Sequence, residues 1–397
     1  MAELARSFTF SRNALKQNIT VSSVPAGIVI LIGLFLFVAV SAHGDDQDTT
    51  PHLQAYIDAG YAASNLSPSN GTWRSKSTTA TLNSPELFLG MVTISKAAVP
   101  KSRWGFELGL QTGLDSENLV TSPPPASNEP VQNADSLRQL YRANVSYLFG
   151  EHGDLRLTGG LINSYIGYES FLGIDNPNYT RTYLIDSVPY FMLGMEAAWK
   201  FRENIDLNFY LVSGYNYLAN PNDVPSGGMQ IKWSVSPKTS FTQNIYYGPD
   251  QGDTSLEYWR FLSNSIIEWR SDRFLAAAAL DFVREKRADQ PGEPVQQWSS
   301  GALWLRWAVN KRLSFALRPE FFRDEDGLSS GARQTIRAYT ATMKYEHNPT
   351  HQRLVAALEF RYDESTGEQG GFYDSPNDRL VSHQSLILAS VMWSFDR

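Results

Sequence analysis

The sequence predicts an all-β fold, a single antiparallel up-and-down barrel of about sixteen strands that crosses a membrane. Three observations carry this prediction. Runs of alternating apolar and polar residues recur along the chain, and aromatic residues recur just before short polar turns. Apart from one stretch near the N-terminus, no apolar run is long enough to cross a bilayer as a helix, so a membrane-spanning chain must form a closed sheet.

The alternating runs define the strands, because successive side chains of a strand point to opposite faces. In residues 104–111, one face carries Trp, Phe, Leu and Leu, and the other carries Gly, Glu, Gly and Gln. A helical stripe would instead repeat every three or four residues. The same alternation predicts further strands at residues 141–149, 191–201, 205–213, 229–235, 313–321, 354–362 and 387–395.

The connections between these runs alternate between short and long. Short turns are centred near residues 98, 152, 203, 237, 271, 311 and 349. The longer polar connections include residues 115–135, 166–180, 215–227, 285–297, 323–333 and 364–379. This alternation predicts short periplasmic turns, long extracellular loops and both termini on the short-turn side, with a strand count between about fourteen and eighteen.

A set of aromatic residues lies on the apolar faces of the strands, each just before a short turn. Paired strands would bring these rings to one height, where Trp and Tyr favour the boundary between lipid and water. A soluble β-sandwich closed by aromatics is the alternative interpretation. The set comprises Tyr147, Phe149, Trp199, Phe201, Trp233, Trp269, Trp307 and Tyr345.

The N-terminus carries the pattern of an export signal. Arg6, Arg12 and Lys16 precede an apolar run at residues 28–40, which is followed by a small-residue cleavage pattern ending at Ala42. The run is shorter than the roughly 18–20 residues of a spanning helix, although a retained anchor is an alternative. We therefore expect two parts, a signal peptide (1–42) and an outer-membrane barrel (43–397), and the long basic region leaves open a start codon downstream of Met1.

Composition excludes several classes of function. The chain contains no cysteine, so it has neither a disulfide framework nor a thiolate metal site. Its formal net charge of -7 disfavours binding to nucleic acid. No phosphate-binding glycine loop, zinc motif or nucleotide fingerprint is present, and we expect no metal, no cofactor and no catalytic residue.

Charged and polar residues of both signs occupy the inward faces of the predicted strands. A barrel of about sixteen strands is wide enough for an aqueous channel, so we expect these groups to be hydrated and to line it. Replacing Arg318 by Leu should then affect conduction more than stability. The inward set comprises Glu107, Arg142, Asn144, Arg156, Glu196, Lys200, Asp206, Asn208, Lys232, Arg318, Glu320, Lys344, Glu359 and Arg361.

The last strand and one long connection carry motifs that resemble a known family. Residues 387–395 form an apolar aromatic ladder, similar to the signal read by the bacterial outer-membrane assembly machinery, although Asp396 and Arg397 follow it. Residues 160–169 and 175–181, followed by Pro189-Tyr190-Phe191, resemble the OmpL-like group of β-barrel porins. The resemblance implies an outer-membrane porin-like channel for small hydrophilic solutes, surrounded by outer-membrane lipid and lipopolysaccharide.

The connection at residues 165–181 is predicted to fold inward and narrow the channel. It is rich in Tyr and Gly and carries charges of both signs, which an exposed loop would not need. An ordinary outward loop is the alternative, with Asn176-Pro177-Asn178 as a simple turn. Its candidates for the constriction are Tyr165, Glu169, Asp175 and Arg181.

Catalysis and calcium binding are competing hypotheses. His383 and Ser385 share a strand face, an arrangement that resembles the nucleophile pair of outer-membrane phospholipase, but no Asn-Gly follows the serine. A structural or adhesive barrel without an open pore is a further alternative. The acidic residues 324–326, and Asp250 with Asp253, lack calcium-loop spacing and are better explained as solvated charge.

The export signal gives a direct test. We predict that the mature protein begins near His43, because the short apolar run ends in a cleavage pattern and barrel strands follow it. N-terminal sequencing of outer-membrane fractions checks this. Recovery of the intact Met1 end in the inner membrane would contradict it.

Overall fold

The computed structural model describes residues 49–397 except residues 119–136, 216–221, 223, 253 and 376. The described residues belong to one compact unit. The expected signal peptide (1–42) and its cleavage site lie outside the described residues, so that boundary stays a prediction.

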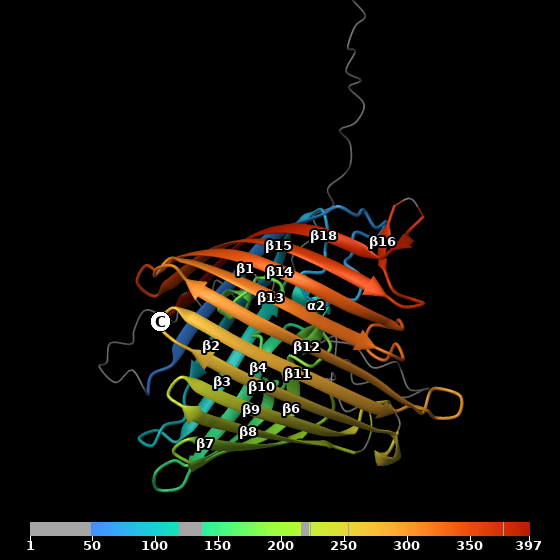
Figure 1. Ribbon diagram of the computed structural model, residues 1–397. Coiled ribbons are helices and arrows are strands. Elements are labelled where there is room, and N and C mark those ends of the chain that lie inside the picture. Colours follow the sequence, from blue (N-terminus) through green and yellow to red (C-terminus); the bar gives the residue numbers. More distant parts are fainter. Residues whose placement is uncertain (1–48, 119–136, 216–221, 223, 253, 376) are drawn as a thin grey trace, which may run out of the picture. The chain divides into compact units, whose positions relative to one another are not determined.

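Sixteen strands form a closed antiparallel barrel, which confirms the predicted fold (Figure 1). Strands that follow one another in the chain pair with each other, and β18 closes the barrel by pairing with both β15 and β1. The barrel strands are β1 (His52–Ser64), β2 (Pro85–Lys96), β3 (Trp104–Thr112), β4 (Leu140–Phe149), β5 (Leu155–Asn163), β6 (Phe191–Arg202), β7 (Ile205–Val212), β8 (Ser226–Ser236), β9 (Thr239–Pro249), β10 (Trp259–Arg270), β11 (Phe274–Lys286), β12 (Val295–Ala308), β13 (Leu313–Asp324), β14 (Gln334–His347), β15 (Gln352–Thr366) and β18 (His383–Asp396).

The remaining described elements are short and lie in the long connections. A two-stranded sheet, β16 (Phe372–Asp374) and β17 (Arg379–Val381), lies between β15 and β18. The helical turns are α2 (Leu114–Asn118), η2 (Gly173–Asp175), α3 (Tyr183–Asp186) and η3 (Leu256–Tyr258). In the described part of the chain, no helix has the length and apolar character needed to cross a membrane.

The seven predicted short turns all connect paired strands, and the longer connections alternate with them. Gln54 near the start of β1 pairs with Asp396 at the end of β18, so the first and last strands meet at the short-turn end. This arrangement follows from an even number of antiparallel strands closed into a ring.

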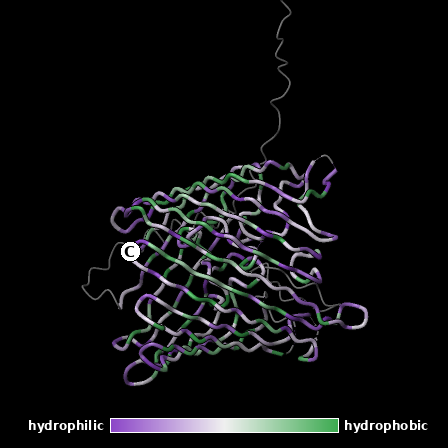
Figure 2. The backbone as a smooth tube through the Cα atoms, in the orientation of Figure 1, coloured by the Kyte–Doolittle hydropathy of each residue, from purple (hydrophilic) through white to green (hydrophobic). Residues whose placement is uncertain are grey.

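Alternation along the strands separates an apolar outer face from an inner face, which on β13 is buried. On β13, Leu317 is 55% exposed, whereas its neighbours Ala316 and Arg318 are 3% and 0% exposed. Figure 2 shows the same change between apolar and polar residues along the strands. Because the hydrocarbon offers no hydrogen-bond partners, the closed sheet satisfies its own backbone groups while apolar side chains contact lipid.

Most of the predicted aromatic set is exposed close to the short turns. Trp199, Trp233, Trp269 and Trp307 are each at least 40% exposed. Neighbouring rings contact one another around the wall, as in the Phe274–Trp307 pair, whose centroids lie 6.5 Å apart. These residues therefore form one girdle of the membrane boundary.

The outward assignment of Leu317 predicts a large effect of charge at that site. We expect Leu317→Arg to destabilise the barrel by about 2–4 kcal/mol, the cost of a cation near the bilayer midplane. Tyr345→Arg is the matched control, because Tyr345 lies in the girdle, where the cost falls to about 0–1 kcal/mol. Denaturant unfolding in lipid vesicles measures both, and equal costs would contradict the assignment of depth.

Candidate functional site

One long connection crosses the inside of the barrel. Residues 164–190, here called the inner segment, join β5 to β6 and contain η2 and α3. Near its start, the Tyr165 hydroxyl donates a hydrogen bond to the carbonyl of Ile245 on β9 at 2.9 Å. Further along, the Tyr179 N–H donates to a carboxylate oxygen of Glu359 on β15 at 2.7 Å. The segment thus contacts wall strands that are far apart around the barrel.

The wall at β7–β11 carries a row of four amide side chains and one carboxyl group that hydrogen-bond in series. Asn208 donates to Gln230 at 2.8 Å, Gln230 donates to Asn244 at 2.8 Å, and Asn244 donates to Asn264 at 2.6 Å. Asn264 in turn donates to Asp281. Consecutive members lie opposite each other in the strand register, so they form one continuous row across β7–β11, here called the amide ladder.

The inner segment begins on this amide ladder. Gln230 donates to the backbone carbonyl of Tyr165 at 2.9 Å, and the ring of Tyr165 stacks on Tyr210 with centroids 3.9 Å apart. A Cβ at Gly228 would lie only 1.9 Å from the Tyr165 hydroxyl oxygen, so glycine is needed there for this close approach. Gly167 follows with φ of +98°, a conformation that favours glycine and turns the segment across the lumen.

The opposite wall, at β13–β15, carries layers of charge. Arg318, Thr340 and Arg361 lie side by side in the register. Glu320 lies between the two arginines, with its Oε1 atom 3.6 Å from Arg318 Nη2 and 2.7 Å from Arg361 Nη2. Asp363 pairs with Arg361 Nε at 2.7 Å, and all four charged side chains are buried.

The inner segment supplies the remaining partners of these layers. Glu169 pairs with Arg318 Nη1 at 2.8 Å and also accepts hydrogen bonds from the Thr182 N–H and hydroxyl. The Thr180 N–H donates to Glu359 at 3.1 Å, and the Tyr183 N–H donates to Glu320 at 3.0 Å. Backbone N–H groups and side chains therefore compensate the buried carboxylates together.

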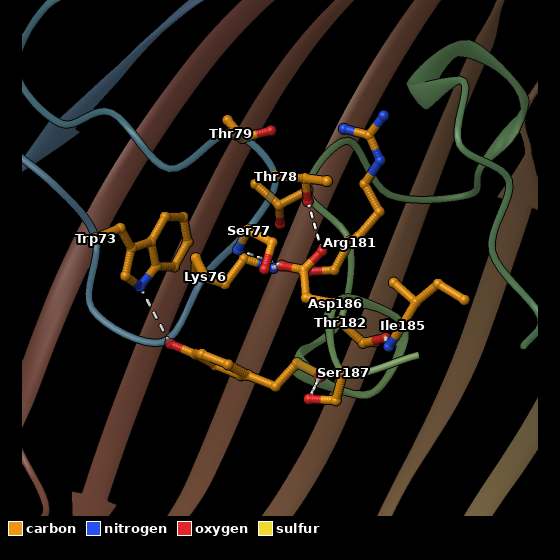
Figure 3. A network of polar contacts seen from close by, with 12 residues as sticks. Trp73, Lys76, Ser77, Thr78, Thr79, Arg181, Thr182, Ile185, Asp186 and Ser187 are labelled. Carbon is orange, nitrogen blue, oxygen red and sulfur yellow. Dashed lines mark hydrogen bonds and ion pairs between the residues drawn. The ribbon is translucent and has the colours of Figure 1, made fainter. Parts of the chain in front are cut away.

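A second connection, residues 65–84 between β1 and β2, covers the inner segment and is called the first loop. Lys76 pairs with Asp186, and the Thr78 hydroxyl donates to the same carboxylate at 2.8 Å. Figure 3 shows Lys76, Ser77 and Thr78 turned toward Asp186. Burial raises the pKa of Asp186, but the adjacent Lys76 ammonium, the Thr78 hydroxyl and the Arg181 charge together outweigh burial and leave that pKa below its usual value.

The connection between β3 and β4, which contains α2, also contacts the inner segment. Asp115 lies 3.4 Å from Arg181 Nη1 and accepts the Thr79 N–H at 2.8 Å. Burial raises the pKa of Asp115 to about 7, although the Arg181 guanidinium opposes this shift. The first loop, α2 and the inner segment thus form one buried polar network.

The burial of the inward residues differs from the expectation that all of them contact water. Arg142, Glu169, Arg181, Arg318, Glu320, Glu359 and Arg361 are buried, so replacing Arg318 should affect stability as well as conduction. The physical reason is that the inner segment and first loop cover the wall. Arg156 is exposed inside the barrel, and Glu107 and Glu196, which are partly exposed, contact Asn144 and Arg156.

Several members of this network were missed from the sequence. All but Asp363, which lies on β15, are in connections between strands, and each has at least one contact within the network to a residue more than 60 positions away. The sequence does contain a sign that the first loop packs inside the barrel, because this loop includes the apolar residues Leu66, Trp73 and Leu82. The missed members are Trp73, Lys76, Thr78, Asp115, Asp186 and Asp363.

Two polar cavities lie on the short-turn side of the inner segment. One has a volume of about 390 Å³ and is bordered by Asp175 and by the ends of β10, β12 and β14. The other has a volume of about 380 Å³ and is bordered by Tyr165, Glu196 and Lys232. Among the predicted constriction residues, Tyr165 and Asp175 therefore border space inside the barrel, whereas Glu169 and Arg181 are buried.

The residues of the catalytic alternative make other contacts. The ring of His383 lies 3.2 Å from the Ser382 hydroxyl and stacks on Tyr362, while the Ser385 N–H donates to Asn65. An acylation nucleophile would need a hydrogen bond between the histidine and Ser385.

The acidic residues considered for calcium also have protein partners. Asp324 accepts the N–H groups of residues 328–330, and Asp250 pairs with Arg260. Asp253 lies outside the described residues. Within the part of the chain that the structure describes, no group of three or more His, Cys, Asp or Glu residues is arranged to hold a metal ion.

Comparison with known proteins identifies both a family and a fold. The family described as "Putative beta-barrel porin-2, OmpL-like" matches residues 51–395. The anion-selective porin of Comamonas acidovorans is similar in structure, with a TM-score of 0.52, 10% identity, and coverage of 87% of this chain and 99% of the porin. Outer-membrane expressed OmpT of Vibrio cholerae gives a TM-score of 0.54, 8% identity, and coverage of 90% and 99%. No curated protein matches this chain.

The buried position of Arg318 predicts a structural effect of its removal. Arg318→Leu leaves Glu169 without its arginine partner in a dry environment, so we expect a loss of about 3–5 kcal/mol or release of the inner segment. Denaturant unfolding and limited proteolysis of the inner segment measure these outcomes. Arg337→Leu is the matched control, because Arg337 is exposed on β14. Wild-type stability and protease resistance in Arg318→Leu would contradict the network.

Proposed function

We propose, from the premise that this chain belongs to the "Putative beta-barrel porin-2, OmpL-like" family, that it conducts small hydrophilic solutes by passive diffusion. The chain is a porin-like outer-membrane β-barrel. The observation that carries the proposal is the pair of polar cavities beside the inner segment, each close to 400 Å³. Such spaces inside a sixteen-stranded wall suit hydrated solutes rather than apolar ligands.

The charged inner wall near the short turns supports an aqueous path. Arg156, Lys200, Asp206 and Lys232 face the inside of the barrel on β5–β8 and are exposed. Charges of both signs that stay in water avoid the desolvation cost of a dry core. A mixed-charge lumen of this kind admits polar solutes without a strong preference for one sign of charge.

In this proposal, the inner segment sets the size of the opening. Tyr165, Asp175 and Glu196 border the free space and form the constriction, together with Arg156, which pairs with Glu196 at 3.4 Å. The buried residues act indirectly by holding the segment against the wall. This group comprises Glu169, Arg181, Arg318, Glu320, Glu359 and Arg361. Arg142 instead contacts Tyr141 and Phe191 on the wall, where Glu107 also accepts a hydrogen bond from Asn144.

The proposal extends to partners at the outer surface and at the chain end. The apolar wall and its aromatic girdle suit outer-membrane lipid and lipopolysaccharide. We propose that the barrel assembly machinery reads β18, the strand that closes the ring against β1. Residues 1–42 serve as the export signal in this account.

A sealed structural or adhesive barrel is the second candidate function. It is favoured by the packing of three connections inside the wall, where Trp73, Tyr179 and Tyr183 are each 1% exposed. Conductance distinguishes the two candidates. A sealed barrel gives no ion current even when it is correctly folded.

The constriction proposal predicts the effect of a deletion. Deleting residues 167–177 should raise single-channel conductance, because it removes the part of the inner segment that lies beside the larger cavity. Deleting residues 288–293, in the connection between β11 and β12, is the control and should leave conductance unchanged. Asp175→Asn should lower any cation preference, since Asp175 borders the cavity. Unchanged conductance and reversal potential in both inner-segment variants would show that the constriction lies elsewhere.

A further inference from the structure

The larger cavity gathers basic residues from four strands near the short-turn end. Arg270 is the last residue of β10, Arg306 lies near the end of β12, Lys344 lies near the end of β14, and Arg353 lies at the start of β15. All four line a space of about 390 Å³ that η2 of the inner segment closes on one side. The basic side chains therefore face one volume although they are distant in sequence.

The acidic residues of the same cavity are already paired. Glu268 accepts from Arg270 Nε at 3.0 Å, and Glu346 accepts from Arg353 Nε at 2.7 Å. Asp175 accepts from Arg353 Nη1 at 2.7 Å. Two arginines thus contact all three carboxylates of the lining.

Two cations remain without a carboxylate partner. Arg306 makes no hydrogen bond or ion pair with any residue that the structure describes, and its side chain is partly exposed. The Lys344 ammonium donates to two backbone carbonyls, those of Gly173 at 2.8 Å and Asn176 at 2.5 Å. Lys344 therefore forms no direct ion pair with a carboxylate of the described residues, and the lining as a whole carries four basic and three acidic residues.

The strand order brings a hydroxyl group between these two cations. Ser314 on β13 lies opposite Lys344 in the register, and β13 lies between β12 and β14. Ser314, Arg306 and Lys344 all line the cavity. An oxyanion in this space would meet a planar guanidinium, an ammonium and a hydroxyl, which are the donors that carboxylate and phosphate groups prefer.

We propose that this cavity is a binding subsite for the oxyanion group, carboxylate or phosphate, of a small solute, with Arg306 as its principal anchor. Lys344 supplies long-range positive charge, and Ser314 supplies a further donor. The excess of one basic residue over the acidic residues suits a single negative charge, because Glu268, Glu346 and Asp175 repel a polyanion. The subsite deepens the proposed function by naming a solute class, and only its role in transport rests on that function.

Direct binding to the full-length mature barrel tests the subsite independently of conduction. Calorimetry in detergent at low ionic strength uses acetate and inorganic phosphate as separate probes. We expect saturable binding of at least one probe, weakened about tenfold or more by Arg306→Gln, because charge-assisted hydrogen bonds are lost. Arg306→Lys retains the charge but not the planar fork and should bind with intermediate affinity.

The binding test has a control at an arginine outside the cavity. Arg312→Gln removes an exposed arginine from the neighbouring short turn and should bind as the wild type does. Arg306→Gln should fold normally, because Arg306 holds no described partner in place. Absence of saturable binding by the wild type, or equal binding by Arg306→Gln, would overturn the subsite. A barrel that binds the probes but carries no current would overturn the channel proposal instead.

Discussion

The arginine–carboxylate contacts between the inner segment and β13–β15 are the interaction on which the interior of this barrel depends. Arg318 and Arg361 are fully buried, and each would be costly without partners. Glu320 bridges them from the wall, while Glu169 reaches Arg318 from the inner segment. The segment and the wall therefore compensate each other's buried charge, and neither surface is complete alone.

Closure of the sheet creates the space that this network fills. Strands in hydrocarbon must satisfy every backbone group, so the barrel closes, and sixteen strands enclose a lumen too wide for wall side chains to fill. The inner segment bridges this space from the amide ladder at β7–β11 to the charged layers at β13–β15. The first loop then adds the buried Lys76–Asp186 pair above it. Free volume remains on the short-turn side, where the two cavities lie.

The wall of this barrel can be predicted from the sequence far better than its interior. Period-two alternation in runs such as residues 313–321 identifies the strand and assigns Leu317 to lipid, because one side of every strand meets hydrocarbon. The same pattern assigns Arg318 to the inner face but carries no information on what covers that face. The pairing of Lys76 with Asp186 depends on how two connections pack, and local periodicity does not encode such contacts.

A cross-link between the inner segment and β14 tests most directly whether the segment is docked against the wall. The Asn178 amide donates to the Thr342 hydroxyl at 2.7 Å, and the chain contains no native cysteine. Asn178→Cys combined with Thr342→Cys should form a disulfide in the membrane-inserted barrel and leave conductance at the wild-type level, because the segment is already docked. Asn178→Cys combined with Ala341→Cys, on the outer face of β14, should not cross-link. No cross-link in the first pair, or a cross-link that sharply lowers conductance, would contradict a docked inner segment.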